Sequence, residues 1–193
     1  MARPIEFDRP KAVNRALALF WRKGYQATSL ADLLEAMDIG RSSFYAAFID
    51  KRSFFIECLD LWAFRTLYLL QDARLQMPPV DALQNFFERS FAGLQGAGAK
   101  ANWGCMLVNT VLEMACVDDE LAARASRHLS DMQRVFQDCL KDSGATPAQA
   151  EELAAMLMLF NEGIRVSIRR RLPDAQHLQP IGTTFRLIRS AIV

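Results

Sequence analysis

Apolar side chains recur at helical spacing along most of the chain, and the alternation typical of β-strands is nearly absent. The clearest pattern lies in residues 28–51, where apolar residues stand three or four positions apart: Leu30, Leu33, Leu34 and Met37. Ser29 precedes this run and Asp32 follows three residues later, which is typical of a helix N-terminus. The spacing predicts a short amphipathic helix that begins after Thr28 or Ser29.

A second short helix is predicted after a tight turn at Asp38. Such a turn often needs left-handed backbone, for which aspartate is a permitted substitute for glycine. Phe44 and Phe48 lie four positions apart and form the expected buried face, while Ile39 fills the gap between the helices. This arrangement is typical of a helix-turn-helix unit, and also of a surface helical hairpin with ordinary capping.

The remaining positions of the second helix suit contact with DNA. Arg41, Ser42, Ser43 and Tyr45 would point outward or sideways from the buried face. Small polar groups at the start of a recognition helix reach base edges, while a cation and a phenol bind phosphates. Lys51 opens the next helix, where its ammonium group and the backbone N–H groups would hold another phosphate.

The rest of the chain is also predicted to be helical. An amphipathic helix that ends at Gly24 is expected before the helix-turn-helix, and the helices expected after it cover about residues 51–76, 80–95, 104–117, 119–143, 147–171 and 174–191. Pro180 should break the last of these or delay its start, because proline lacks the N–H that a helix interior uses. The glycine-rich loop at 96–102 should be mobile. These patterns predict an all-α fold of about nine helices, with a three-helix head at 1–50 and a larger body at 51–193.

The charge is distributed unevenly over the 193 residues, although the net charge is only +1. Residues 1–52 contain nine Lys or Arg against six acids, whereas the remainder contains 14 bases and 16 acids. A basic head on an acidic body fits DNA contact at one end, and the alternative is random scatter, which a difference this small does not exclude.

The sequence lacks the signals of several other classes of protein. The longest purely apolar run, 153–160, is far shorter than the ~20 residues of a membrane span. The N-terminus has no apolar signal region, so we expect a cytoplasmic protein without membrane contact. His128 and His177 are the only histidines, without metal-ligand spacing, and there is no glycine-rich phosphate loop. We therefore expect no enzyme, no metal and no cofactor.

The flanks of the helix-turn-helix carry a family pattern. Its positions are Gly24-Tyr25, Thr28, Phe44-Tyr45, Phe48 and Lys51. Over roughly residues 9–60 the chain closely resembles the N-terminal domain of TetR/AcrR-type transcriptional regulators. The resemblance implies an all-helical homodimer, usually a repressor, whose C-terminal domain binds an inducer.

The resemblance also bears on the contacts with double-stranded DNA. Thr28, Arg41, Ser43, Tyr45 and Lys51 match the family's usual contacts, and with Ser29 and Ser42 they form the predicted DNA-binding set. Ala46 and Ala47 depart from the family, where many members have an aromatic or basic residue and then a histidine. The phosphate contacts should therefore fall mainly on Arg41, Tyr45 and Lys51.

The helix expected at 147–171 is apolar on nearly all sides, so it needs cover on several faces. Its own domain covers one face, and a second subunit is the expected cover for another. The predicted dimer interface consists of Phe160, Ile164, Ile168, Phe185 and Ile188, which fits the four-helix interface of the family. The alternative is a central core helix in a monomer.

The helix expected at 104–117 places Asn109 and Glu113 among apolar residues. Polar groups buried without partners are costly, so these two are expected to orient a small ligand, unless neighbouring helices bond to them. The predicted pocket for a small apolar inducer combines them with aromatic and sulfur-containing residues: Phe87, Phe91, Trp103, Cys105, Met106, Asn109, Glu113 and Phe160. The alternative is ordinary core packing.

Cys105 allows a different signal. A Gly-Cys pair at this position resembles a sub-group of the family in which the cysteine senses electrophiles or oxidants, and a helix N-terminus favours the thiolate. Cys116 lies eleven residues further, roughly 16 Å along one helix, too far for a disulfide. The alternatives are a buried, unreactive cysteine and, for the whole chain, a non-regulatory helical protein-binding module.

Overall fold

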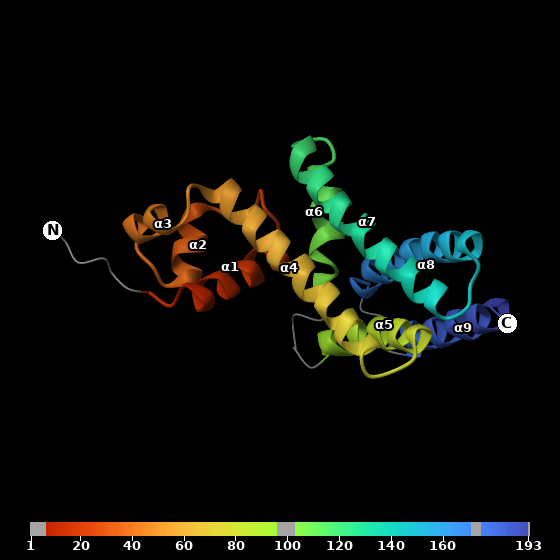
Figure 1. The fold of residues 1–193 in the computed structure, drawn as a ribbon. Helices are drawn as coiled ribbons and strands as arrows, with labels where there is room; N and C mark the ends of the chain where they lie inside the picture. Colours follow the sequence, from red (N-terminus) through yellow and green to blue (C-terminus); the bar gives the residue numbers. More distant parts are fainter. Residues whose placement is uncertain (1–6, 96–102, 171–174, 193) are drawn as a thin grey trace.

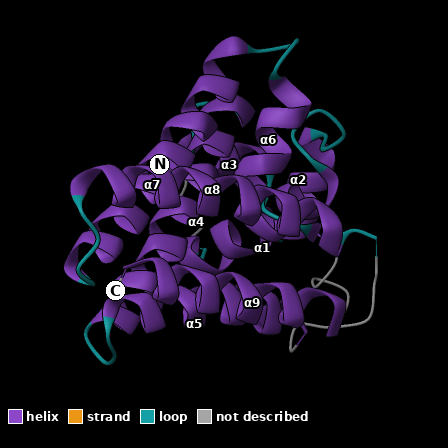
Figure 2. Ribbon diagram, turned by 90° about the vertical axis from the view of Figure 1, so that its right-hand side faces the viewer, coloured by secondary structure: helices purple, strands orange, loops and turns teal. Residues whose placement is uncertain are grey.

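The computed structural model of the chain describes residues 7–95, 103–170 and 175–192, with the side chains of 90–95 left aside. Within these ranges it contains nine α-helices and no strand (Figures 1 and 2). They are α1 Arg9–Lys23, α2 Leu30–Met37, α3 Arg41–Ala47, α4 Lys51–Arg74, α5 Pro79–Gln95, α6 Met106–Met114, α7 Asp119–Asp142, α8 Pro147–Ile168 and α9 Ala175–Ile192. The all-α prediction is confirmed. The predicted mobile loop at 96–102 lies outside the described residues.

The helices form a small head and a larger body joined by α4. In Figure 1, α1, α2 and α3 gather at one end, and α4 runs from them into the body built by α5 to α9. Within the body α6 and α8 both pack against α7, while α5 packs against α4, α7 and α9. The two ends of α4 therefore belong to different packing environments.

An aromatic cluster forms the core of the head. Phe20 of α1 meets Phe55 of α4 edge to face, with ring centroids 4.9 Å apart. Phe54 of α4 lies 5.6 Å from Phe44 and 4.1 Å from Phe48, and all of these rings are buried. The first two turns of α4 thus complete the head, so the packed unit extends past the boundary at residue 50 that the sequence predicted.

A second aromatic cluster fills the body. The Phe87 ring of α5 lies 5.6 Å from Phe136 of α7, 5.4 Å from Phe185 of α9 and 5.9 Å from Phe160 of α8. Offset and edge-to-face pairs of this kind contribute beyond the area that they bury. One phenylalanine therefore joins four helices.

The predicted break at Pro180 is wrong, because α9 runs through it from Ala175 to Ile192. Proline removes one hydrogen bond to the residue four positions earlier, here Gln176. Gln176 and Pro180 are both exposed, so water replaces the missing donor at little cost.

Two phenylalanines of α4 provide a matched test of the head core. Phe54→Ala should lower the free energy of unfolding by about 3–5 kcal/mol, because the truncation leaves a cavity among three aromatic rings. Phe64→Ala removes a ring that is 66% exposed, so its effect should stay near about 0.5 kcal/mol. Denaturant unfolding measures both, and equal losses would contradict this assignment of the core.

Candidate nucleic-acid interface

The start of α2 is fixed by a reciprocal cap. The Ser29 hydroxyl accepts the Asp32 N–H at 3.1 Å, and the Asp32 carboxylate accepts the Ser29 N–H at 2.8 Å. The Ser29 N–H and hydroxyl, together with Lys23, lower the pKa of Asp32 to about 2. The predicted capping box is confirmed, and it commits the Ser29 hydroxyl to the helix start.

The turn between α2 and α3 has the backbone that the sequence predicts. Asp38 adopts left-handed dihedral angles, φ 60° and ψ 47°, and is the only non-glycine residue with positive φ in the described chain. Its N–H donates to the carbonyls of Leu34 and Glu35, which closes α2. Ile39 packs against the head core, so α3 leaves the turn at a fixed angle.

The outer face of α3 is open to solvent. Phe44 is buried, whereas Arg41, Ser42 and Tyr45 are exposed and Ser43 is half-buried. The Arg41 guanidinium lies 5.9 Å from the centroid of the Tyr45 ring, which is 50% exposed. This face carries one cation, one phenol and two small hydroxyls, the groups that phosphates and base edges require.

Lys51 stands at the first position of α4, next to the Asp50 cap, which accepts the Ser53 N–H at 2.7 Å. Its Nζ lies 4.3 Å from the centroid of the Tyr25 ring, and partial burial lowers its pKa. The ring of Tyr25 holds the ammonium group near the α1–α2 turn.

The prediction of a DNA contact by the Thr28 side chain is wrong. Thr28 is 0% exposed, and its hydroxyl donates to the Gly24 carbonyl at 2.6 Å. The hydroxyl therefore supports the α1–α2 turn instead of facing a phosphate.

Glu113 of α6 joins the body to the head. Its two carboxylate oxygens accept the N–H groups of Tyr25 and Gln26, at 3.0 and 2.8 Å. Gly24 allows this approach, since it has φ +84° and an added Cβ would lie 2.6 Å from Glu113 Oε2. The carboxylate of Glu113 therefore has protein partners, which is the alternative that the sequence left open for this residue.

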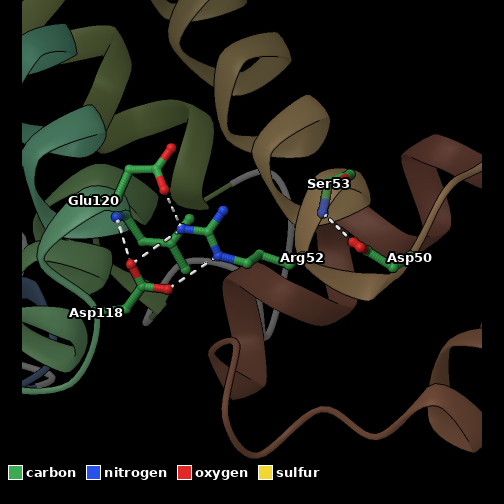
Figure 3. A network of polar contacts seen from close by, with 6 residues as sticks. Asp50, Arg52, Ser53, Asp118 and Glu120 are labelled. Atoms are coloured by element: carbon green, nitrogen blue, oxygen red, sulfur yellow. Dashed lines mark hydrogen bonds and ion pairs between the residues drawn. The ribbon is translucent and has the colours of Figure 1, made fainter.

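Arg52 makes a second link, which Figure 3 shows between the first turn of α4 and the start of α7. Its Nε lies 3.1 Å from Asp118, and its Nη2 lies 2.7 Å from Glu120. The Asp118 carboxylate also caps α7 through the Leu121 N–H at 3.0 Å. Arg52 follows Lys51 directly in the sequence. Lys51 is the expected phosphate contact, and Arg52 binds the body.

Trp21 makes a third link near the other end of α6. Its Nε1–H donates to the Gly104 carbonyl at 3.0 Å, and its ring meets that of Trp103 edge to face at 5.3 Å. The three links follow α6 from the residues before its first turn to those after its last. No local pattern in the sequence indicates these links, because their partners lie 66 to 88 residues apart.

Among the described residues, the predicted pocket set is divided between different parts of the body. Phe87 and Phe160 belong to the aromatic cluster of the body, and Met106 is buried. Asn109 donates to the Trp103 carbonyl at 2.7 Å, close to the head instead of the cluster. The side chain of Phe91 lies outside the described residues.

Cys105 is buried at the N-cap of α6. Burial raises the pKa of its thiol, whereas the nearby Arg165 guanidinium and the N–H groups of Val108 and Leu107 act to lower it. Arg165 itself is buried in α8, and burial lowers its pKa. Burial is the largest of these effects, so the pKa of the enclosed thiol lies above its ordinary value.

The predicted dimer face needs correction. Ile168, Phe185 and Ile188 are buried within the chain, so their side chains are not available to a partner. Phe160 and Ile164 remain half-buried and line an open cleft of about 300 Å³ between α8 and α9. The large apolar side chains exposed on these two helices are Met156, Leu159, Val166, Leu178 and Leu187.

The fold and the exposed α3 face define a helical protein with an N-terminal helix-turn-helix and a separate body. Residues 13–58 match the model of the bacterial regulatory proteins of the tetR family, and residues 79–181 match the LmrA/YxaF-like C-terminal domain of transcriptional regulators. The chain belongs to the TetR family of DNA-binding transcriptional regulators. No helix in the described ranges is long and apolar enough to cross a membrane.

Several relatives share most of their length with this chain. The transcriptional repressor ComR of Escherichia coli K12 is 29% identical, over 96% of this chain and 90% of ComR. The repressor DhaR of Mycobacterium sp. strain GP1 is 28% identical, over 78% and 74% of the two chains. A cysteine-substituted form of the TetR-family regulator CifR, solved with a 26-base-pair operator DNA, superposes with a TM-score of 0.80. It is 28% identical and covers 95% of this chain and 98% of CifR.

The link at Glu113 can be measured directly. Glu113→Gln keeps the size of the side chain but leaves one of the two N–H groups without a carboxylate oxygen, at a cost of about 1–3 kcal/mol. The amides of Tyr25 and Gln26 should then exchange with solvent deuterium faster than in the wild type. Glu151→Gln changes an exposed glutamate of α8 and should leave these amides unchanged. Unaltered exchange in Glu113→Gln would contradict the link.

Proposed function

We propose that the protein is a repressor that binds a near-palindromic operator as a homodimer. The exposed face of α3 carries the proposal, because Arg41, Ser42 and Tyr45 stand together on a helix whose opposite side is fixed by Phe44. In this proposal Ser42 and Ser43 approach base edges, while Arg41, Tyr45 and Lys51 bind phosphates. Repression is named for ComR and DhaR, and operator binding for CifR.

The homodimer is supported by apolar side chains on the outer faces of α8 and α9. Leu159, Leu187 and Val166 are each at least half exposed, and Phe160 and Ile164 line the cleft between the two helices. Apolar surface of this kind is typical of a protein interface. A two-fold axis there predicts operator half-sites about one helical turn apart, or a multiple of it.

The release signal in this proposal is a small apolar inducer that reaches the body. The Phe87 ring packs against the Phe136 ring at 5.6 Å and against the Phe185 ring at 5.4 Å. The ligand must therefore displace part of this cluster. Displacement would shift α5, α7 and α9 together. Because α7 begins at the residues that hold Arg52, a shift of α7 reaches the head.

The DNA contacts give a quantitative test. Arg41→Ala should weaken binding to DNA from upstream of the protein's own gene at least tenfold and lower the salt slope by roughly 0.9 for each lost phosphate contact. Tyr45→Ala should weaken binding with little change in slope, because the phenol is uncharged. Ala46→Ser, on the same helix, should change neither. Fluorescence anisotropy at several salt concentrations measures all three variants, and equal losses in all of them would contradict the proposed face.

A second candidate signal is favoured by the surroundings of Cys105. Cys105 is the N-cap residue of α6, where two backbone N–H groups and the Arg165 guanidinium act to lower the pKa of its thiol, although burial, the largest effect, raises it. The thiolate would add to an electron-poor alkene, forming a carbon–sulfur bond, while the thiol proton is transferred to the neighbouring carbon. The added group cannot fit in the enclosed site, so α6 must move with its three links to the head.

Thiol sensing is tested with N-ethylmaleimide on the protein–DNA complex. The wild type should release DNA as Cys105 is alkylated, whereas Cys105→Ser should bind DNA normally and stay bound. Cys116→Ser removes the exposed cysteine and should still release DNA. Release of the Cys105→Ser variant would rule out this signal and leave the apolar inducer.

A further inference from the structure

An open cleft of about 400 Å³ lies where the head meets the body. It is bounded by the end of α1, by α6 and by the residue after α8. Its main lining residues are Trp21, Arg22, Asn109, Leu112, Glu113 and Arg169. It is separate from the outer face of α3 and from the aromatic cluster of the body.

The cleft has an excess of positive charge. Arg22 and Lys23 come from α1, and Arg169 follows α8. Lys23 is paired with Asp32 at 3.1 Å, whereas neither Arg22 nor Arg169 forms an ion pair with any residue that the structure describes. The one carboxylate in the lining is that of Glu113, which already accepts two backbone N–H groups. The lining thus contains two guanidinium groups, one from α1 and one from the residue after α8, that are available to an anion.

Arg169 is held in place at the edge of the cleft. Its Nη2 donates to the Trp103 carbonyl at 3.2 Å, which uses one of five guanidinium donors. The Asn109 amide donates to the same carbonyl at 2.7 Å, and Gly104 lies close to the guanidinium. A positioned guanidinium binds a carboxylate with less loss of side-chain freedom than a mobile one.

The cleft also has an apolar wall. The Trp21 indole is fixed by its bond to the Gly104 carbonyl and by edge contacts with Trp62 and Trp103, at 6.2 and 5.3 Å. Leu112 of α6 lies at the cleft and is 69% exposed, although it belongs to an otherwise largely buried helix. A flat ring placed between Trp21 and Leu112 would cover both.

We propose that this cleft binds a small aromatic carboxylate. The carboxylate is held between Arg22 and Arg169, where charge-assisted hydrogen bonds to guanidinium are strong. The ring packs on Trp21 and Leu112. The volume lies near the lower end of the range for ligand sites, which suits a single ring.

This site does not depend on the proposed repression, because binding needs no DNA. Its walls nevertheless come from the head and from the body, so an occupied cleft favours one arrangement of the two. Any effect of the carboxylate on DNA affinity must be matched by an equal effect of DNA on carboxylate affinity.

Intrinsic fluorescence provides a direct readout with benzoate as the probe. The three tryptophans of the chain, Trp21, Trp62 and Trp103, form one contact group, in which Trp21 lines the cleft. Benzoate should change their emission saturably, whereas benzamide, its neutral analogue, should not. Arg22→Gln and Arg169→Gln should each raise the Kd for benzoate at least tenfold. Arg170→Gln removes a neighbouring exposed cation outside the lining and should leave the Kd unchanged.

The outcomes separate clearly. Circular dichroism establishes that each variant keeps its helical content, and the arginines come from different elements, so a folding defect in one leaves the other informative. The proposal is overturned if benzoate gives no saturable change, if benzamide binds equally well, or if Arg170→Gln weakens binding as much as Arg169→Gln. Loss of DNA binding in the Arg41→Ala variant with benzoate binding retained would show that the two proposals stand apart.

Discussion

The position of the DNA-binding head depends on one carboxylate in the body. Glu113 accepts the N–H groups of Tyr25 and Gln26, at the turn where α1 gives way to α2. These two groups follow the end of a helix and have no other acceptor among the described residues, so without Glu113 they would need water. Glycine at position 24 is required both by its positive φ and by the closeness of the carboxylate. The family's Gly-Tyr pair therefore has a physical reason in this chain. Gly24 leaves room for the Glu113 carboxylate, and the N–H of Tyr25 donates a hydrogen bond to it.

The same turn leads directly to the expected phosphate contacts. The Tyr25 ring carries Lys51 on its face at 4.3 Å, and the next residue, Arg52, is paired with Asp118 and Glu120. Two links from the body thus end next to Lys51. Glu113 binds the backbone of Tyr25, whose ring contacts Lys51, and Asp118 binds Arg52, which follows Lys51 in the sequence. Surface ion pairs contribute little to stability, so the value of Arg52 lies in orientation more than in free energy.

The sequence predicted the head better than the body because the features of the head are local. The capping box at Ser29 and the left-handed Asp38 depend on residues within a few positions, and the structure confirms both. Thr28 was misassigned because its hydroxyl is satisfied by Gly24, a bond that periodicity does not reveal. In the body, the apolar spacing of α8 and α9 predicted burial but not which side is covered, so Phe185 and Ile188 were placed on the outer face. Glu113 was recognised as a polar residue in need of partners, but the partners lie 87 and 88 residues away.

The three links to the head impose a constraint on any signal that acts in the body. Gly104 holds Trp21 before α6 begins, Glu113 holds the α1–α2 turn near its end, and Asp118 holds Arg52 beyond it. Because α6 is a rigid helix with links near both of its ends, a movement at one end also displaces the contacts at the other. A change beside Cys105 would act first on Trp21, whereas a change in the aromatic cluster would act through α7 on Arg52. Signals that enter at different places would therefore move the head about different fixed points, even though they share one element.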